Sequence, residues 1–351
     1  MKKYYLIICL LISITLLSCR GSSSLKSDEG NSIYYWRTTF SLSDKENEFL
    51  KEHEVKKIYM RFFDVNRTYS DIDNEDVIPE ATIRFNDTVP NDIDVVPTIY
   101  ITTSAIEKMQ TKEMEYAEKI YKRVTAIGKK NNITIKEIQL DCDWTKGTRQ
   151  PFFRLCEAMK EYMDSTQELS STIRLHQLTQ TPPPVDKGVL MVYNTGNLME
   201  MTSDNSIFSR KDIEPYLRDN RLALYPLPLD VAYPAYGWSV VFRPEKDKYY
   251  FDRIMRRTDF SCFPPLHKIA SNLYEATSEV IFYEDNTKSD YVFEKYRIRV
   301  ERPSAKEILE IKNLIDNQLK TKKHNNLLYH LDESQLSHYS NNEISKIYSR
   351  N

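Results

Sequence analysis

The segment Glu137–Trp144 reads EIQLDCDW, and this stretch decides the fold that we predict. Its residues alternate between apolar and polar types, and successive side chains of a β-strand point to opposite faces. The apolar face carries Ile138, Leu140 and Cys142, and the polar face carries Gln139, Asp141 and Asp143. In a closed barrel the apolar face packs against outer helices. We therefore expect the polar face to point inward and to rise toward the C-terminal rim.

Seven further strand-like runs lie before and after this segment, and stretches with helical periodicity separate most of them. The predicted strands are residues 33–40, 57–65, 95–102, 137–144, 171–178, 188–193, 222–229 and 326–331. The predicted helices are residues 44–53, 104–130, 151–165, 210–219, 304–320 and 343–349. This alternation predicts a single (β/α)8 TIM-barrel-like domain over residues 32–351. The alternative, an open α/β sheet, is disfavoured because the chain has only 7 glycines and no glycine-rich phosphate loop.

The seventh unit departs from this pattern. No crossover helix is evident between the predicted strand 222–229 and the helix that begins at Ser304. Strand-like aromatic runs occur instead, at residues 238–243, 279–283 and 296–300. We expect an inserted β-hairpin or small sheet after strand 7, at about residues 230–303, on the barrel mouth.

The N-terminus resembles a bacterial lipoprotein signal. Two lysines precede an apolar run over residues 4–17, which is shorter than the roughly 20 residues that span a bilayer. The resemblance implies a signal peptide over residues 1–18, lipidation of Cys19 and a flexible tether over residues 19–31. It also implies a place in the cell envelope, at the outer membrane, because Arg20 follows the cysteine where inner-membrane lipoproteins usually carry Asp. The alternative is a short N-terminal anchor helix.

Charge and motif content exclude several classes of partner. Lys and Arg number 49 against 51 Asp and Glu, a net charge of -2, so the chain lacks the basic surface that nucleic acids require. No C-x-x-C or H-E-x-x-H motif occurs. We expect no nucleic acid, no metal and no cofactor, and contact with a membrane only through the N-terminal lipid.

Two aspartates at the end of the fourth strand are the first candidates for chemistry. An inward charge is costly unless it is paired, and Arg61 and Arg174 are also predicted to point inward. Asp141 therefore has two interpretations, a buried ion pair that fills the barrel or a functional carboxylate. Asp143 lies one pleat higher, at the rim where barrel enzymes carry their catalytic groups, and we favour a functional role for it.

Asp141, Cys142, Asp143 and Trp144 resemble the fourth-strand motif of chitinase-type (family 18) glycoside hydrolases, which ends Asp-x-Asp-x-Glu. The resemblance implies a glycan ligand. In that family the glutamate is the general acid, but here Thr145 occupies its position. Either Asp143 replaces it or the site is inert. The resemblance also suggests that Tyr193 holds an N-acetyl group, with a core tyrosine as the alternative. More broadly, the chain resembles bacterial surface lipoproteins with glycosidase-like barrels.

A second candidate region follows the predicted seventh strand, in the aromatic loop 229–238. Its aromatic rings can stack on sugar rings, and Asp230 can accept hydrogen bonds from hydroxyl groups or act as the partner carboxylate of Asp143. The alternative is a packed loop beneath the insertion. Trp144, Tyr193, Tyr236, Trp238 and His176 are the predicted substrate-binding residues.

The leading hypothesis is a lipid-anchored glycoside hydrolase, with Asp143 as acid, Asp230 as second carboxylate and Asp141 tuning Asp143 through its like charge. The competing hypothesis is a noncatalytic glycan-binding or scaffold lipoprotein on a degenerate barrel, which Thr145 favours. A structural lipoprotein without a small ligand is a third, because a fold alone does not confer activity.

Overall fold

The computed structural model describes residues 30–68, 76–284, 287–319 and 323–349. The predicted signal peptide 1–18, Cys19 and the predicted tether as far as residue 29 lie outside the described residues. Within the described ranges, no helix combines the length and the apolar character needed to cross a bilayer.

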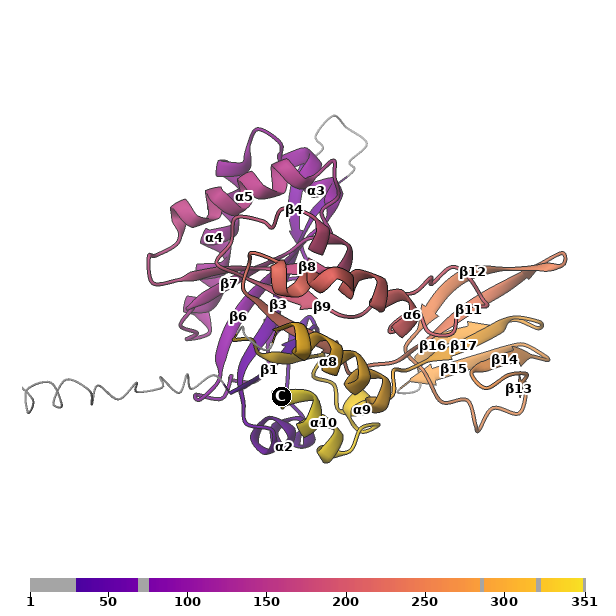
Figure 1. The fold of residues 1–351 in the computed structure, drawn as a ribbon. Helices are drawn as coiled ribbons and strands as arrows, with labels where there is room; N and C mark the ends of the chain where they lie inside the picture. The colour runs from indigo at the N-terminus through magenta and orange to yellow at the C-terminus, as the bar shows by residue number, and fades with distance from the viewer. Residues whose placement is uncertain (1–29, 69–75, 285–286, 320–322, 350–351) are drawn as a thin grey trace, which may run out of the picture. The chain divides into compact units, whose positions relative to one another are not determined.

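Eight parallel strands close into a ring, which confirms the predicted (β/α)8 barrel (Figure 1). Neighbours in sequence are neighbours in the ring, and β1 pairs with both β3 and β18 to close it. The barrel strands are β1 (Asn31–Tyr35), β3 (Val55–Arg67), β6 (Asp94–Ile101), β7 (Glu137–Asp141), β8 (Glu168–Arg174), β9 (Lys187–Met191), β10 (Leu229–Pro234) and β18 (Asn326–Tyr329). Three short strands, β2 (Thr39–Phe40), β4 (Val77–Glu80) and β5 (Arg84–Phe85), accompany them.

Amphipathic helices cover the outside of the ring. In α4 (Glu113–Lys130), for example, the residues Tyr116, Ala117, Ile120 and Val124 are buried at helical spacing. The helices are α2 (Asp44–Glu52), α3 (Thr103–Met109), α4 (Glu113–Lys130), α5 (Arg149–Tyr162), α6 (Arg210–Ile213), α7 (Arg221–Leu224), α8 (Ala305–Leu319), α9 (Glu333–Leu336) and α10 (Asn341–Tyr348). Two 3₁₀ turns, η1 (Leu175–Thr179) and η2 (Glu214–Asn220), accompany them. The predicted helix 104–130 is divided in two, because Thr111 has a positive φ of 70° that no helix accommodates.

The seventh strand is not where the sequence pattern predicted it. Residues 222–229 were expected to form a strand, but Leu222 lies in α7 and the strand β10 begins only at Leu229. Pro226 and Pro228 lie between α7 and β10, and together they remove two backbone N–H donors from this short segment. Residues 229–234 of the loop predicted at 229–238 thus form the strand itself.

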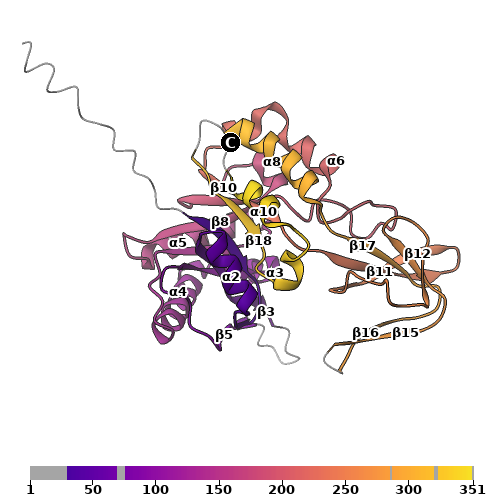
Figure 2. The ribbon, with the colours of Figure 1, turned by 90° about the horizontal axis from the view of Figure 1, so that it is seen from below.

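A separate sheet is inserted after β10, which confirms the predicted small sheet. Its strands are β12 (Lys248–Met255), β11 (Trp238–Glu245), β17 (Arg297–Glu301), β14 (Leu273–Ala276) and β13 (Leu266–Lys268), and the hairpin β15 (Val280–Glu284) and β16 (Thr287–Val292) accompanies it. These strands are grouped together in both views (Figures 1 and 2). The sheet has its own apolar core, in which Val241, Phe260 and Ile298 are buried.

The barrel interior is polar at mid-height. The Tyr34 hydroxyl of β1 donates to Gln139 Oε1 of β7 at 2.9 Å, and the Thr98 hydroxyl donates to the same oxygen at 3.3 Å. Strands β1 and β7 are not neighbours in the ring, so the first contact must pass through the interior. This confirms that the polar face of β7 points inward.

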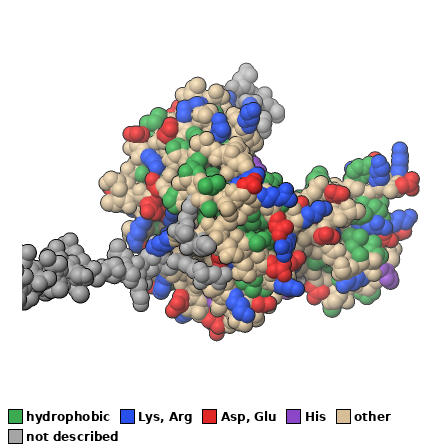
Figure 3. All heavy atoms as spheres, in the orientation of Figure 1, with side chains coloured by type: hydrophobic (Ala, Val, Ile, Leu, Met, Phe, Trp, Pro, Cys, Tyr) green, Lys and Arg blue, Asp and Glu red, His purple; other side chains and the backbone are tan. Residues whose placement is uncertain are grey.

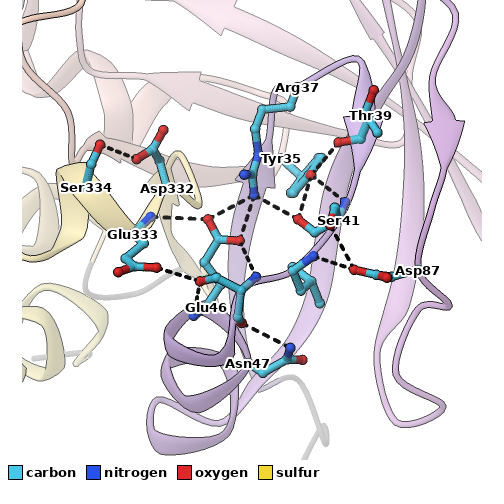
Figure 4. A network of polar contacts seen from close by, with 12 residues as sticks. Tyr35, Arg37, Thr39, Ser41, Glu46, Asn47, Asp87, Asp332, Glu333 and Ser334 are labelled. Carbon is cyan, nitrogen blue, oxygen red and sulfur yellow. Dashed lines mark hydrogen bonds and ion pairs between the residues drawn. The ribbon is translucent and has the colours of Figure 1, made fainter. Parts of the chain in front are cut away.

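A polar network joins the loops that follow the first and last barrel strands (Figure 4). Arg37 donates to both carboxylate oxygens of Glu46, at 2.9 and 2.8 Å. Glu46 also accepts from the backbone N–H of Glu333, and Ser43 donates to the Glu333 carboxylate at 2.8 Å. Because Glu46 is buried and Glu333 begins α9, the network fixes the rim where the barrel closes on itself.

Candidate functional site at the barrel mouth

A cavity of about 210 Å³ lies at the C-terminal ends of the barrel strands, and we term it the mouth cavity. Every contributing side chain comes from the upper part of a barrel strand or from a residue just beyond its end. The lining residues are Trp36, Arg61, Asp64, Tyr100, Asp141, Arg174, Tyr193, Asn194 and Tyr329. The cavity therefore combines aromatic rings with charged groups at the end of the barrel where ligands usually bind.

Asp141 forms the floor of the mouth cavity. It is only 4% exposed and accepts hydrogen bonds from the Thr172 hydroxyl at 2.6 Å and from Arg174 Nη2 at 3.2 Å. Burial raises the pKa of Asp141, and the Arg174 guanidinium opposes that rise. The buried ion pair, one of the two interpretations of Asp141, is therefore present, and Asp141 also faces the cavity.

Asp143 lies at the rim above Asp141, and its side chain is 53% exposed. Arg174 Nε donates to its carboxylate, so one guanidinium holds both aspartates. Burial alone would lower the pKa of Arg174, but the two carboxylates together raise it. The guanidinium is therefore fixed as a cation between Asp141 and Asp143.

A second arginine and carboxylate pair faces the cavity from β3. Arg61 Nε donates to Asp64 Oδ1 at 2.7 Å, and Nη2 donates to the other carboxylate oxygen. The Arg61 guanidinium also lies 5.6 Å from the ring centroid of Trp36. The pair presents a planar, fixed set of donors and acceptors to the cavity.

Aromatic rings form one wall, centred on Tyr329 at the end of β18. The Tyr329 ring centroid lies 5.8 Å from that of Trp36, 4.9 Å from that of Tyr193 and 5.5 Å from that of Tyr236. Trp238 packs behind Tyr236 at 5.6 Å. Of the predicted aromatic residues, Tyr193 thus lines the cavity, whereas Tyr236 and Trp238 support the wall from behind.

Polar contacts fix this wall in place. The Tyr236 hydroxyl donates to Asn194 Oδ1 at 2.7 Å, and Trp238 Nε1 donates to the Glu301 carboxylate at 2.7 Å. Glu301 is buried in the inserted sheet, where Arg299 pairs with it. The inserted sheet therefore holds the outer end of the aromatic wall.

Asp230 lies at the opposite end of the barrel, which corrects its prediction as the partner of Asp143. It is the second residue of β10, pairs in register with Val189, and accepts a hydrogen bond from the backbone N–H of Asn325 at 2.7 Å. Burial raises its pKa, and Lys187, at the start of β9, opposes the rise. The misplaced strand explains the error, because a strand beginning at Leu229 puts Asp230 at its lower end.

Trp144 does not reach the cavity, which corrects its prediction as a substrate-binding residue. It is fully buried and its ring lies 5.4 Å from that of Phe153 in α5. β7 ends at Asp141, so the strand alternation that was extended to Trp144 stops before it. Trp144 packs in the helix layer.

His176 and Thr145 lie at the rim beside Asp143. His176 is exposed and belongs to the turn η1 and not to a strand, since β8 ends at Arg174. Partial burial lowers the pKa of His176, and Asp143 opposes that shift. Thr145 is exposed, and its hydroxyl lies 3.3 Å from that of Thr148. The position where the family 18 motif has its acid therefore carries no carboxyl group.

Trp36 and Tyr329 were not predicted from the sequence. Both lie at or just beyond the end of a barrel strand, Trp36 after β1 and Tyr329 as the last residue of β18. An aromatic residue at the end of each strand was the signal that the sequence offered. It was not enough to bring the two residues together, because β1 and β18 become neighbours only when the ring closes.

The mouth holds no obvious metal site. In the part of the chain that the structure describes, no group of three or more His, Cys, Asp or Glu side chains is placed to bind an ion. On the face seen in Figure 3, basic and acidic side chains are intermixed.

Comparison with known proteins finds similarity of fold. No family model and no curated protein matches the chain. A structure of YKL-39 solved with chitooligosaccharides has a TM-score of 0.50 at 8% identity, covering 91% of this chain and 98% of that one. The class V chitinase from Nicotiana tobaccum has a TM-score of 0.49 at 9% identity, covering 92% and 99%. The Bacillus cereus spore cortex-lytic enzyme SleL has a TM-score of 0.47 at 13% identity, covering 91% and 75%. The similarity to the YKL-39 structure thus supports the (β/α)8 barrel fold.

Proposed function

We propose that the protein binds carbohydrate in the mouth cavity and does not hydrolyse it. The observation that carries this proposal is the pairing of the carboxylates. Asp64 is paired with Arg61, and both Asp141 and Asp143 are paired with Arg174. Glycoside hydrolysis needs one carboxyl that donates a proton to the leaving oxygen. Each of these three carboxyl groups is already engaged in hydrogen bonds within the protein, and Thr145 supplies no replacement acid.

The lining of the cavity supports a sugar ligand. Trp36 and Tyr329 offer flat apolar faces, and Asp64, Arg61 and Asn194 offer hydrogen-bonding groups beside them. The volume of about 210 Å³ is below the ~300–1,000 Å³ of pockets for drug-sized ligands. It suits a single sugar unit of a longer chain. YKL-39, which has a similar fold, was solved in the presence of chitooligosaccharides (GlcNAc4), so that oligosaccharide is the natural first probe.

Hydrolysis is the second candidate, and the raised pKa of Asp141 is the observation that favours it. A carboxyl with a raised pKa is what a general acid requires. Asp141 is buried beneath Arg174, however, and its Oδ1 already accepts two hydrogen bonds. Binding without turnover therefore fits the geometry better.

The N-terminal sequence extends the proposal to location. The lipoprotein-like signal and Cys19 support a lipid-anchored protein of the cell envelope, at the outer membrane. Metabolic labelling with palmitate tests this proposal directly. Label should be incorporated into the wild type and lost in Cys19→Ser, and label retained in that variant would contradict the anchor.

Titration calorimetry with chitotetraose tests binding, together with chromatography of the sugar after long incubation. We expect saturable binding to the wild type with no shorter products. Trp36→Ala should weaken binding about tenfold by removing a stacking face. Tyr250→Ala, which removes an exposed ring on β12 away from the cavity, is the matched control and should bind like the wild type.

Two outcomes would contradict this proposal. Absence of binding to any chitooligosaccharide would contradict the ligand class. Release of shorter sugars by the wild type, abolished in Asp143→Ala, would show that the protein is a hydrolase after all.

A further inference from the structure

A second cavity, of about 530 Å³, lies between the inserted sheet and the segment that follows β18. Residues 254–259, at the end of β12 and beyond it, line one side. Arg302, which follows β17, and residues around α9 line the other. The mouth cavity and this cavity have no lining residue in common.

Three arginines converge on this second cavity, which we term the arginine cavity. Arg256, Arg257 and Arg302 all line it, and none forms an ion pair with a carboxylate among the described residues. Other arginines of the same sheet are paired, namely Arg253 with Asp252 and Asp290, Arg297 with Glu275, and Arg299 with Glu301. Among the described residues of 238–302, the arginines without an ion pair are thus the three that line this cavity.

Within the part of the chain that the structure describes, the hydrogen bonds of the Arg302 guanidinium go to neutral oxygens. Its Nη1 donates to Gln335 Oε1 at 3.0 Å, and its Nη2 donates to Thr258 Oγ1 at 2.8 Å. Burial lowers its pKa. Arg257 lies over the rings of Phe263 and Phe282, at 5.1 and 5.5 Å from their centroids. Partly buried cations without a paired anion are costly, so the arrangement favours an anion from outside.

The carboxylates that line the arginine cavity form hydrogen bonds and ion pairs with other groups, although Asp332 also attracts Arg302 and opposes the lowering of its pKa. Asp290 pairs with Arg253. Asp332 caps α9, accepting from the Ser334 hydroxyl at 2.6 Å and the Gln335 backbone N–H at 3.3 Å. Asp259 accepts from the hydroxyl and backbone N–H of Ser261 in a local turn, and the attraction of Arg257 is a smaller influence on its pKa.

We propose that the arginine cavity binds an oxyanionic group, a carboxylate or a phosphate, of an external ligand. A guanidinium is a planar fork of N–H donors that matches both groups in a bidentate way. Three guanidinium groups, with the Thr258 hydroxyl beside them, line the cavity with N–H and O–H donors for an oxyanion. The volume is within the usual range for a small-molecule site. This site does not depend on the proposed function of the mouth.

Titration calorimetry at low ionic strength tests the site with inorganic phosphate and, separately, with glucuronate. Glucose is the neutral control. We expect saturable binding of at least one of the two anions and none of glucose. Binding of phosphate alone identifies a phosphate ligand, and binding of glucuronate alone identifies a carboxylate ligand.

Variants separate a built site from general attraction to positive charge. Arg256→Gln, at an exposed position, and Arg302→Lys, which keeps the charge but removes the fork, should each weaken binding about tenfold. Arg243→Gln removes an arginine of the same sheet that is paired with Glu245 outside the cavity, and it should bind like the wild type. Circular dichroism checks that each variant is folded. No saturable binding of either anion, or equal binding by all variants, would overturn the proposal.

Discussion

The two ends of the barrel contain the same kinds of charged groups but arrange them differently. At the closed end, where the strands begin, Glu137 is almost fully buried and pairs with Lys57 at 3.1 Å and Lys187 at 2.7 Å. At the mouth, Arg61 and Arg174 hold their carboxylates around a cavity. At the closed end one carboxylate, Glu137, pairs with two lysines, whereas at the mouth one arginine, Arg174, pairs with two aspartates.

We propose that the two arrangements have different roles, stability at the closed end and ligand binding at the mouth. Lysine ammonium groups are point charges that neutralise a buried carboxylate, and the pairs at the closed end fill the barrel. Arginine forks fix the orientation of the groups that they bind, and at the mouth those groups line a cavity beside aromatic rings. We therefore expect changes at the closed end to alter unfolding, and changes at the mouth to alter ligand affinity.

The largest expected effect is on stability, from Glu137→Ala. The substitution removes the buried carboxylate that pairs with both Lys57 and Lys187, and breaking a buried ion pair costs about 3 kcal/mol of unfolding free energy. Urea denaturation measures it. Glu168→Ala is the control, because the Glu168 carboxylate lies 3.7 Å from the Lys187 ammonium group but its side chain is 60% exposed. Its loss should lower the free energy of unfolding by less than about 1 kcal/mol. Equal losses in both variants would contradict the distinction.

The two ends should also show opposite dependence of stability on pH. Burial would raise the pKa of Glu137, but Lys187 and Lys57 hold it below its ordinary value of 4.5. Its contribution is therefore present above that value and is lost as the pH falls through the folded-state pKa. The pKa of Asp141 is raised above 3.8 by burial. Its contribution is present below 3.8 and is lost as the pH rises through the folded-state pKa.

Asp141→Asn and Glu137→Gln test these signs by urea denaturation between pH 3 and pH 7. Relative to the wild type, Asp141→Asn should gain stability as the pH rises. Glu137→Gln should lose stability over the same range, because only the wild type gains its ionised pair. The same trend in both variants would show that the ends are not distinguished by their charges.

The smallest expected effect is on ligand affinity, and it compares two aspartates at opposite ends of the barrel. Asp64→Asn disturbs the Arg61 pair in the mouth cavity and should weaken chitotetraose binding about fivefold, the equivalent of one hydrogen bond of ~1 kcal/mol. Asp230→Asn, at the closed end, should leave the affinity unchanged. Titration calorimetry compares them. If Asp230→Asn weakened chitotetraose binding and Asp64→Asn left it unchanged, the ligand would bind at the closed end and not at the mouth.

The fold could be predicted because its signals are local. The alternation in residues 137–141 requires one face toward the interior, and the contact of Tyr34 with Gln139 shows that face inside the barrel. The prediction of the seventh strand was wrong because it gave the apolar residues around Pro226 and Pro228 more weight than the backbone N–H groups that the two prolines lack. That one error also displaced Asp230.

The site was harder to predict because it depends on ring closure. Trp36 and Tyr329 are nearly three hundred residues apart, and their contact at 5.8 Å exists only because β1 pairs with β18. The Arg174 pairs with Asp141 and Asp143 were within reach of strand alternation, since β7 and β8 are adjacent. Which arginine would pair with which aspartate depends on register, and the sequence pattern does not specify it.

A crystal structure of the protein with chitotetraose tests the central claim most directly. The account predicts an intact oligosaccharide with one sugar ring in the mouth cavity, stacked on Trp36 or Tyr329, and with hydroxyl groups bonded to the Arg61 and Asp64 pair. Cleaved sugar beside Asp143, or a sugar bound elsewhere with the mouth cavity empty, would contradict it.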